Sequence, residues 1–564
     1  MVGKKIQNLP NSLINLQRMK TLSIHNTSLE SIPDSLFKLK SLENFSLNNN
    51  KLVEIPDFNE GLANLIHLDI ENEKQLLKIP NDMNCLISLR SLNLINSNIS
   101  QLSKNIGKLQ FLEKINLTNC PIERLPETFG NLNNLNQLDL SNNNLKQLPE
   151  SFGNLKNLQN LDLSNNCLEV LPKSFGNLKN LQKLDLSNNC LEVLPKSFGN
   201  LILLNNLNLN NNKLKELPES IGNLVTLEFL VLNNNDLNEL PLSFGNLKRL
   251  RFLYVDDNFI KIFPKTFSNL ENLYYLSACN NRILQIPEDL DKLEILQQLY
   301  LNNNNISIIP DSLCKNKKLY DLSLKSNNIT ELPKSIKFLR NLGSLMLDDN
   351  KIVEIPDELS MIQSICTLSL RNNPISSFPM SLSNLELGIF NISGIELDKF
   401  PLENKKWLEM LKKKNAKLIT NDPDWIYYMT QSLNSRIIDI WIESINSAKN
   451  GDCLYLLYEY YEHISYCIRY AQDNDQVILE DGYSDEYTGM NFYPIEEFHG
   501  VEHFNYYYTV SIENFFEDLK LFIHDKDDLH KVNFKVSHRS YHKTILLKTE
   551  FIQILNDIKK DIPY

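Results

Sequence analysis

The sequence has little of what marks several large classes of protein. Its 564 residues include 16 glycines and 22 prolines, too few for a collagen-like or low-complexity chain. No apolar run approaches the roughly 18 residues that a membrane helix needs. The opening MVGKKIQNLPNSLINL has two lysines but no apolar core behind them, so we expect no secretion signal. Composition predicts a folded protein that does not act at a membrane.

Cysteines are few, scattered and odd in number. They are Cys85, Cys120, Cys167, Cys190, Cys279, Cys314, Cys366, Cys453 and Cys467. None forms a CxxC pair, and their spacing does not predict a disulfide framework. Reduced thiols are typical of the cytosol, so we expect a cytoplasmic location. Cys167 and Cys190 stand in identical sequence surroundings and are expected to be packing residues, because free cysteine behaves as a small hydrophobe.

Charge divides the chain near residue 420. Residues 421–564 carry 12 Lys and Arg against 25 Asp and Glu, a net charge of −13, whereas the first 420 residues carry 45 against 44. The same last 144 residues hold 16 of the 21 tyrosines. This change of composition predicts two different domains.

The first part of the chain repeats one pattern of leucines. The frame L-x-x-L-x-L-x-x-N-x-L-x-x-L-P begins seventeen times between residues 19 and 387, nearly always 23 residues apart, and a half-unit precedes it. The stretch LDLSNNCLEVLPKSFGNL at 161–178 returns unchanged at 184–201. A period of 20–29 residues with this pattern is the signature of leucine-rich repeats.

The pattern also indicates how the repeats stack. The alternating L-x-L places leucines on one face of a short strand, and each unit needs its neighbours to bury that face. We therefore predict an α/β solenoid, a horseshoe with a parallel sheet on its concave side, plus a small C-terminal α/β domain. The frame asparagine can donate and accept, so its column is predicted to form a buried ladder that satisfies turn backbones. Its members are Asn143, Asn166, Asn189, Asn212, Asn235, Asn258, Asn281, Asn304, Asn327, Asn350 and Asn373.

The unit LPxSFGNLxNLxxLxLSNNxL resembles the intracellular 23-residue repeats of Ras-suppressor, Scribble and plant Ras-group proteins. The resemblance implies a curved scaffold that binds a protein partner on its concave sheet, without catalysis or cofactor. It does not identify the partner. The sequence therefore divides into three segments: the repeat array at 1–401, a helical cap at 402–420, and an acidic, aromatic-rich α/β domain at 421–564. In the cap, one helical face is predicted to seal the last repeat, and it consists of Leu402, Trp407, Leu408 and Leu411.

Units ten to thirteen differ from the others at the positions that should face the concave surface. Most units have small polar or charged residues there, including the column Asp139, Asp162 and Asp185. Rigid aromatic residues are typical of binding hot spots, so these units predict a partner-binding patch. Two alternatives stay open: the positions vary freely, or the C-terminal domain covers them. The predicted patch consists of Phe229, Val231, Phe252, Tyr254, Tyr275 and Tyr300.

The last 144 residues do not follow the repeat. Apolar spacing predicts helices at 431–449, 454–468, 513–523 and 550–558, and strands at 476–480, 504–512, 531–536 and 544–548. Twelve acidic residues and no basic one lie between Arg469 and Lys520. That stretch is either a solvated loop or a surface for a basic partner, and it disfavours nucleic acid.

One string in this region matches a catalytic motif. His499 to His503, HGVEH, has the H-x-x-E-H order of a zinc protease, but the glycine inside it and the aromatic residues after it disfavour the helix that zinc ligation requires. Surface or packing histidines are the better explanation of the string. We therefore predict no catalytic residue, no metal and no cofactor.

The leading hypothesis is a non-enzymatic scaffold that binds protein on the concave face. The alternative is an immunity- or inhibitor-type protein whose acidic C-terminal domain captures a basic partner. A zinc hydrolase is the third possibility.

Overall fold

The computed structural model describes residues 6–58, 61–77, 79–80, 82–397, 400–413, 417–419, 453–456, 465–471, 476–483, 493–494 and 544–547. The chain divides into two compact units, Met1–Ile419 and Thr420–Tyr564. Within the described residues, no helix combines the length and the apolar character that crossing a bilayer requires.

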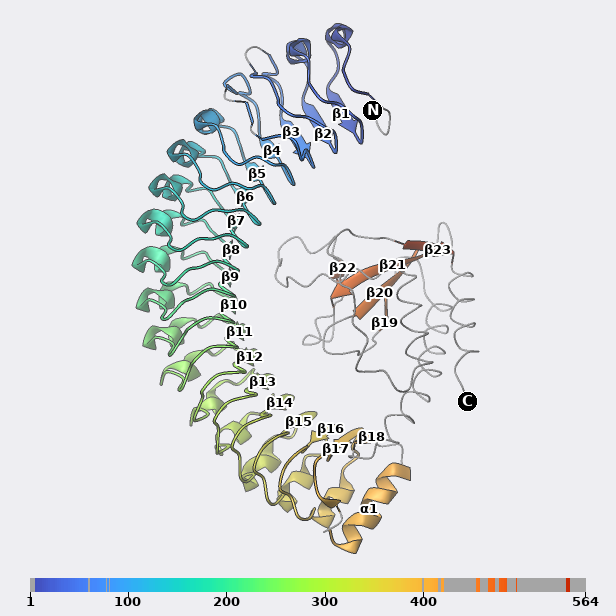
Figure 1. Cartoon of the computed structure of the whole chain (residues 1–564). Helices are drawn as coiled ribbons and strands as arrows, with labels where there is room; N and C mark the ends of the chain where they lie inside the picture. The colour runs from blue at the N-terminus through green and yellow to red at the C-terminus, as the bar shows by residue number, and fades with distance from the viewer. Residues whose placement is uncertain are drawn as a thin grey trace. The chain divides into compact units, whose positions relative to one another are not determined.

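The first unit is one curved array whose inner side is a parallel sheet, as predicted (Figure 1). Neighbouring strands pair in a register of 23 residues over most of the array, for example Leu161 with Leu184. The strands are β1 (Thr21–His25), β2 (Asn44–Asn48), β3 (His67–Glu71), β4 (Ser91–Asn93), β5 (Lys114–Asn116), β6 (Gln137–Asp139), β7 (Asn160–Asp162), β8 (Lys183–Asp185), β9 (Asn206–Asn208), β10 (Phe229–Val231), β11 (Phe252–Tyr254), β12 (Tyr275–Ser277), β13 (Gln298–Tyr300), β14 (Asp321–Ser323), β15 (Ser344–Met346), β16 (Thr367–Ser369), β17 (Ile389–Asn391) and β18 (Lys417–Ile419).

The outer side of the array carries short 3₁₀-helices, because a 23-residue unit leaves room for about one turn between strands. Proline precedes most of them, and its fixed φ suits the extended residue before a helical turn. They span Asn11–Asn15, Asp34–Lys38, Lys104–Lys108, Glu127–Asn131, Glu150–Asn154, Lys173–Asn177, Lys196–Asn200, Glu219–Asn223, Leu242–Asn246, Phe267–Asn269, Leu290–Lys292, Leu313–Lys315, Lys334–Phe338, Asp357–Met361 and Met380–Asn384.

The SFGN segment of the repeat explains the tight stacking of these helices. The buried rings of Phe175 and Phe198 are parallel, with centroids 6.1 Å apart. A Cβ on Gly176 would lie 2.0 Å from the carbonyl oxygen of Ser197 in the next unit. Only glycine allows the backbones to approach so closely, so the Phe-Gly pair fixes the spacing of the outer side.

The two consecutive asparagines that follow the strand in most repeats have different structural roles. The first adopts positive φ, as Asn188 does at 53°, a conformation that asparagine tolerates better than most residues. The same position has positive φ in sixteen consecutive units, where it is Asn except at Asp257, Ser326 and Asp349. The second asparagine, such as Asn189, is buried.

This second column makes the same hydrogen bonds in all eleven units from Asn143 to Asn373. Each Nδ2 donates to a backbone carbonyl of the preceding unit, and each Oδ1 accepts from a backbone amide of that unit. Nδ2 also reaches two carbonyls of its own unit, which for Asn189 are those of Leu186 and Ser187. The column therefore satisfies buried backbone groups where each strand turns away from the sheet.

The C-terminal end of the array differs in part from the prediction. Helix α1 (Leu402–Lys413) buries Trp407, whose ring contacts Phe378 and Phe390 at 5.9 and 5.7 Å between centroids. Leu402, expected on the buried face, is exposed. Lys417–Ile419, expected within a helical cap, pairs with β17 as the last strand of the sheet. An edge strand offers unpaired backbone groups, and β18 satisfies those of β17.

In the second unit, the described residues form an antiparallel sheet of β19 (Cys453–Leu456), β20 (Ser465–Ala471), β21 (Gln476–Tyr483), β22 (Tyr493–Pro494) and β23 (Thr544–Leu547). The strands predicted at 476–480 and 544–548 are confirmed. The helix predicted at 454–468 is wrong, because β19 and β20 pair across it. Its Leu and Ile spacing fits a helix, but its aromatic and β-branched residues favour strands. The other predicted elements of the tail lie outside the described residues.

Candidate protein-binding surface

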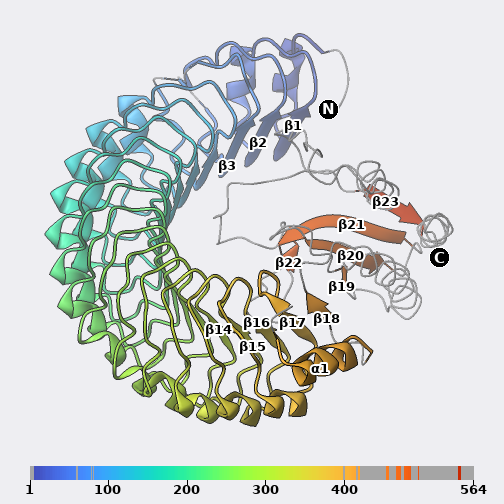
Figure 2. The same ribbon diagram turned by 60° about the horizontal axis from the view of Figure 1, so that its bottom comes forward.

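The concave surface is built by two alternating positions of every three-residue strand. The middle residue, a leucine in most units, points into the array, and the residues on either side of it face the opposite way. Figure 2 shows these strands side by side along the inner surface of the first unit. Residues that differ between units at these positions therefore define what the surface can bind.

A column of carboxylates crosses β6, β7 and β8. Asp139, Asp162 and Asp185 are register neighbours on adjacent strands. Burial, and then the charges of Asp185 and Asp139, raise the pKa of Asp162 well above its ordinary value. The amide of Ser164 donates to Asp162 at 2.8 Å and partly offsets this rise. The column is thus an acidic strip in which like charges repel.

Aromatic rings cover β10 to β13, two strands further on. The ring of Tyr275 lies 4.7 Å from that of Tyr254 and 5.5 Å from that of Tyr300. Phe229 contacts Phe252 and Tyr254 at 6.0 and 5.5 Å. The rings are tilted rather than coplanar, as is usual for aromatic pairs. The strand register therefore brings five of the six predicted patch residues into one cluster of rings.

The members of the predicted patch differ in exposure. Phe229, Phe252, Tyr254 and Tyr300 are half-buried, whereas Val231 and Tyr275 are 8% and 2% exposed. Tyr274, which sequence reasoning did not include, lies 5.8 Å from Phe252. The Tyr-Tyr doublet was the available signal, but Tyr274 precedes the strand and was not counted as a surface position. Below, the aromatic cluster means Phe229, Phe252, Tyr254, Tyr274, Tyr275 and Tyr300.

The edges of the aromatic cluster are polar. The Arg251 guanidinium lies 5.7 Å from the ring centre of Phe252, within the range of a cation–π contact. On the other side, the Tyr300 hydroxyl donates to Asp321 at 2.7 Å. The cluster is an apolar area bordered by a cation and a carboxylate.

One set of hydrogen bonds recurs in every second unit beside and beyond the cluster, and we call it a staple. In each staple, a side-chain oxygen just after one strand accepts from a serine hydroxyl and from a backbone amide of the next unit. Asp256 accepts from the hydroxyl of Ser277 and the amide of Cys279, both at 2.6 Å. Asn302 accepts in the same way from Ser323 and Lys325, at 2.6 and 2.9 Å. Burial raises the pKa of Asp256 to about 6, whereas Asn302 provides the same acceptor without a charge.

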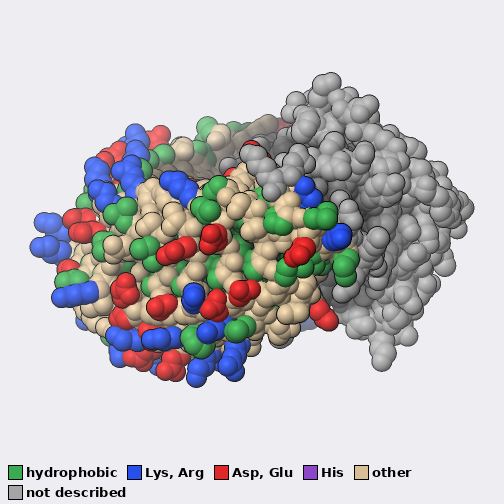
Figure 3. Space-filling view, turned by 90° about the horizontal axis from the view of Figure 1, so that it is seen from below, with side chains coloured by type: hydrophobic (Ala, Val, Ile, Leu, Met, Phe, Trp, Pro, Cys, Tyr) green, Lys and Arg blue, Asp and Glu red, His purple; other side chains and the backbone are tan. Residues whose placement is uncertain are grey.

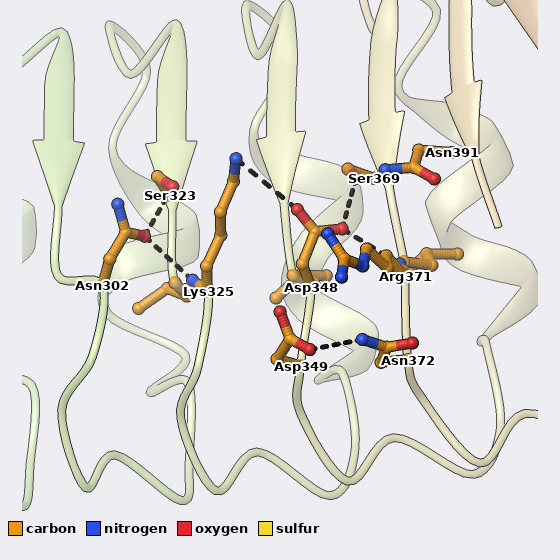
Figure 4. Close-up of polar contacts among 12 residues, drawn as sticks. Asn302, Ser323, Lys325, Asp348, Asp349, Ser369, Arg371, Asn372 and Asn391 are labelled. Atoms are coloured by element: carbon orange, nitrogen blue, oxygen red, sulfur yellow. Dashed lines mark hydrogen bonds and ion pairs between the residues drawn. The ribbon is translucent and has the colours of Figure 1, made fainter. Parts of the chain in front are cut away.

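Asp348 provides the third staple. It accepts from the Ser369 hydroxyl and from the Arg371 amide, and its second oxygen lies 3.5 Å from the Lys325 ammonium. Figure 4 shows the Asn302 and Asp348 contacts side by side, two units apart, with Lys325 on the unit between them. These polar contacts hold the surface residues after the strands in fixed positions.

Elsewhere on the array, charges of both signs alternate. Figure 3 shows Lys and Arg interspersed with Asp and Glu over one side of the repeats. Some form exposed pairs between units, such as Lys215 with Glu192 and Lys248 with Glu271, each at 2.8 Å. Exposed pairs contribute little to stability.

The cysteines fall into two groups. Cys120 and Cys314 are buried, and burial raises the pKa of each thiol to about 11. Cys167, expected to pack inside, is exposed, and Cys190 is half-buried. The expectation was wrong because their position follows the buried asparagine and precedes a buried leucine, and the chain passes through the surface between the two.

Among the residues that the structure describes, no group of three or more potential metal ligands occurs. The HGVEH string at 499–503 lies outside these residues. So does most of the acidic stretch between Arg469 and Lys520, and the alternative of a basic partner for it stays a prediction.

Two family models match the array. One, described as a leucine-rich repeat region, matches residues 68–162, 130–208 and 196–281. The other, described as leucine rich repeat, matches residues 271–329. No curated protein matches the chain in sequence.

Solved structures share the fold. A leucine-rich-repeat protein of Leptospira interrogans is 29% identical, with a TM-score of 0.57, over 74% of this chain and 94% of its own. A plant peptide hormone receptor, RGFR1, solved in complex with RGF2, is 24% identical, with a TM-score of 0.55, over 73% of this chain and 76% of its own.

A structure of the Drosophila Toll–Spätzle complex is 25% identical, with a TM-score of 0.58, over 69% of this chain and 55% of that chain. The family models cover the middle of the array, and the structural likeness covers most of the first unit. Together with the 23-residue register, they show that the first unit is a leucine-rich-repeat array.

Proposed function

We propose that this protein binds a protein partner on the concave face of its repeat array, with the aromatic cluster as the main anchor. The observation that carries the proposal is the set of ring contacts across β10 to β13, at 4.7 to 6.5 Å. Aromatic side chains bury a large area while losing little conformational entropy, and they dominate many interfaces.

The geometry supports a preformed surface. Tyr275 is held between Tyr254 and Tyr300, and Asp321 fixes the Tyr300 hydroxyl. Rings that are already ordered lose less freedom when a partner binds, which favours affinity. The staples at Asp256 and Asn302 keep the neighbouring loops in place.

Two of the similar structures are complexes with a ligand, the plant receptor with RGF2 and Toll with Spätzle. They support a protein-interaction role for an array of this kind. The proposal assigns no catalytic step and no cofactor, and it includes a cytoplasmic location, which cell fractionation tests.

The test compares two double variants of the full-length chain as baits in quantitative affinity purification. F252A/Y254A removes two half-buried rings, and each truncation at a hot spot costs about 2 kcal/mol or more. Proteins bound through the cluster should therefore be recovered at least about 30-fold less well for each ring lost. Tyr275 is left intact because it is buried and its loss would open a cavity.

The control is T21A/N44A, which changes the position equivalent to Phe252 on two other neighbouring strands, β1 and β2. It should recover all partners at the wild-type level. Circular dichroism melting of both variants shows whether the array is intact. If F252A/Y254A retains every partner of the wild-type bait, the aromatic cluster is not the binding site and the proposal fails.

A further inference from the structure

Cys167 and Cys190 occupy equivalent positions in two adjacent units. They lie 23 residues apart, which is the register of the β7–β8 pair. The amide of Cys190 donates to the carbonyl of Leu168, the residue after Cys167, at 2.9 Å. The backbone therefore holds the two cysteines directly beside each other in the stack.

Their separation is bounded on both sides of the array. Strands of the sheet lie about 4.8 Å apart, and the Phe175 and Phe198 rings of the same two units lie 6.1 Å apart on the outer side. The cysteines lie between these two columns, so their Cα atoms are about 5–6 Å apart. Cα atoms joined by a disulfide are usually roughly 4.4–6.8 Å apart.

Both thiols are free, and they are more accessible than those of Cys120 and Cys314. Cys167 is exposed and Cys190 is half-buried. Their neighbours in the same column, Asn144 and Lys213, are exposed, so the column runs along the surface of the array. A small reagent can reach this pair.

We propose that Cys167 and Cys190 form a dithiol site that a small-molecule disulfide converts into a cross-link between two repeats. The Cys167 thiolate attacks the reagent disulfide, which forms a mixed disulfide and releases one reagent thiolate. The Cys190 thiolate then attacks the Cys167 sulfur, which forms the Cys167–Cys190 bond and releases the second reagent thiolate. The two protein thiols lose two electrons and two protons, and the reagent disulfide is reduced to two thiols.

Cys366 provides an internal control. It is also exposed, but its register neighbours are Gly343 and Gly388. A mixed disulfide on Cys366 therefore has no adjacent thiol to displace it. The same reagent should leave a stable adduct there and an adduct-free cross-link at Cys167 and Cys190.

The experiment treats full-length reduced protein with glutathione disulfide, digests it without reduction and maps the peptides by mass spectrometry. We expect one peptide pair joined through Cys167 and Cys190 and lighter by two hydrogens than the sum of its parts. C167S and C190S should each carry one glutathione on the remaining cysteine, as Cys366 does in every sample. Separate glutathione adducts on both cysteines of the wild type, or no reaction at either, would overturn the proposal.

Discussion

The buried column at the second asparagine position of the repeat has two parts, a regular part from Asn143 onward and an irregular N-terminal part. Both must satisfy buried backbone groups, but they do so with different side chains. From Asn143 onward, each amide both donates and accepts, and Asn189 alone bonds three carbonyls and one amide. In the first units, Ser97 donates one bond of 3.4 Å to Ile70, and Glu73 only accepts.

The difference shows what asparagine contributes. A serine reaches one carbonyl, and a carboxylate reaches amides but cannot satisfy a carbonyl unless it is protonated. A buried backbone group without a partner costs free energy. The regular part of the array should therefore depend strongly on its asparagines, whereas Ser97 should contribute little to the N-terminal part.

The largest effect should come from breaking the regular column. N189A leaves the carbonyls of Leu163, Leu186 and Ser187 and the Leu168 amide without this partner, so we expect a loss of about 3–4 kcal/mol. S97A should cost below about 1 kcal/mol, because it removes one long bond. Urea unfolding of both variants, with hydrogen exchange to locate the weakened units, measures the contrast. Equal losses would show that the two parts of the column do not differ.

A smaller effect should distinguish a glycine packed against backbone from a glycine packed against a side chain. G176A places a Cβ against the carbonyl of Ser197, whereas G343A meets the ring of Tyr320, an exposed side chain. Overpacking against a fixed backbone costs about 1–3 kcal/mol, and we expect this loss for G176A alone. Thermal unfolding of the two variants is the measurement. A loss of similar size in G343A would mean that the ring is as fixed as the backbone.

The smallest effect concerns pH. Burial raises the pKa of Glu73, although the Asn50 and Leu52 amides oppose the rise. A raised pKa in the folded state means that the protonated acid stabilises the fold at low pH and that this contribution is lost as pH rises through the folded-state pKa. E73Q should therefore flatten the decline in stability above about pH 4.3. Unfolding of wild type and variant at a series of pH values tests this, and parallel curves would contradict it.

Much of the fold could be predicted because the same leucine pattern recurs in seventeen units. Leucine spacing alone specifies the strands, their register and the inner face. Of the asparagine doublet, the buried second residue was predicted, but the positive φ of the first was not. Two identical residues give no sign that Asn188 adopts positive φ whereas Asn189 is buried. β19 and the first residues of β20 were misassigned to one helix, because a single short segment has no repeats against which its spacing can be compared.

For the candidate surface, the sequence predicted which side chains are neighbours, because strand register determines this. It predicted less well how deeply each side chain is buried. Alternation along the strands brought Phe229, Phe252 and Tyr254 together. It did not show that Tyr275 is buried among its neighbours, or that Tyr274 joins from outside the strand. The exposure of Cys167 was missed for the same reason. Side-chain depth depends on packing between units, which one unit's sequence does not contain.

The uniform register gives the array a modular length. The segments 161–178 and 184–201 are identical, so deleting or adding one 23-residue module there would exchange each local contact for an equivalent one. The outer side is spaced at 6.1–6.4 Å over these units and the inner side at about 4.8 Å, so every module turns the array by a similar angle. Adding or deleting one module would leave the core packing unaltered and change the distance between β1 and β18. The size of the concave face can therefore change by duplication of a single repeat.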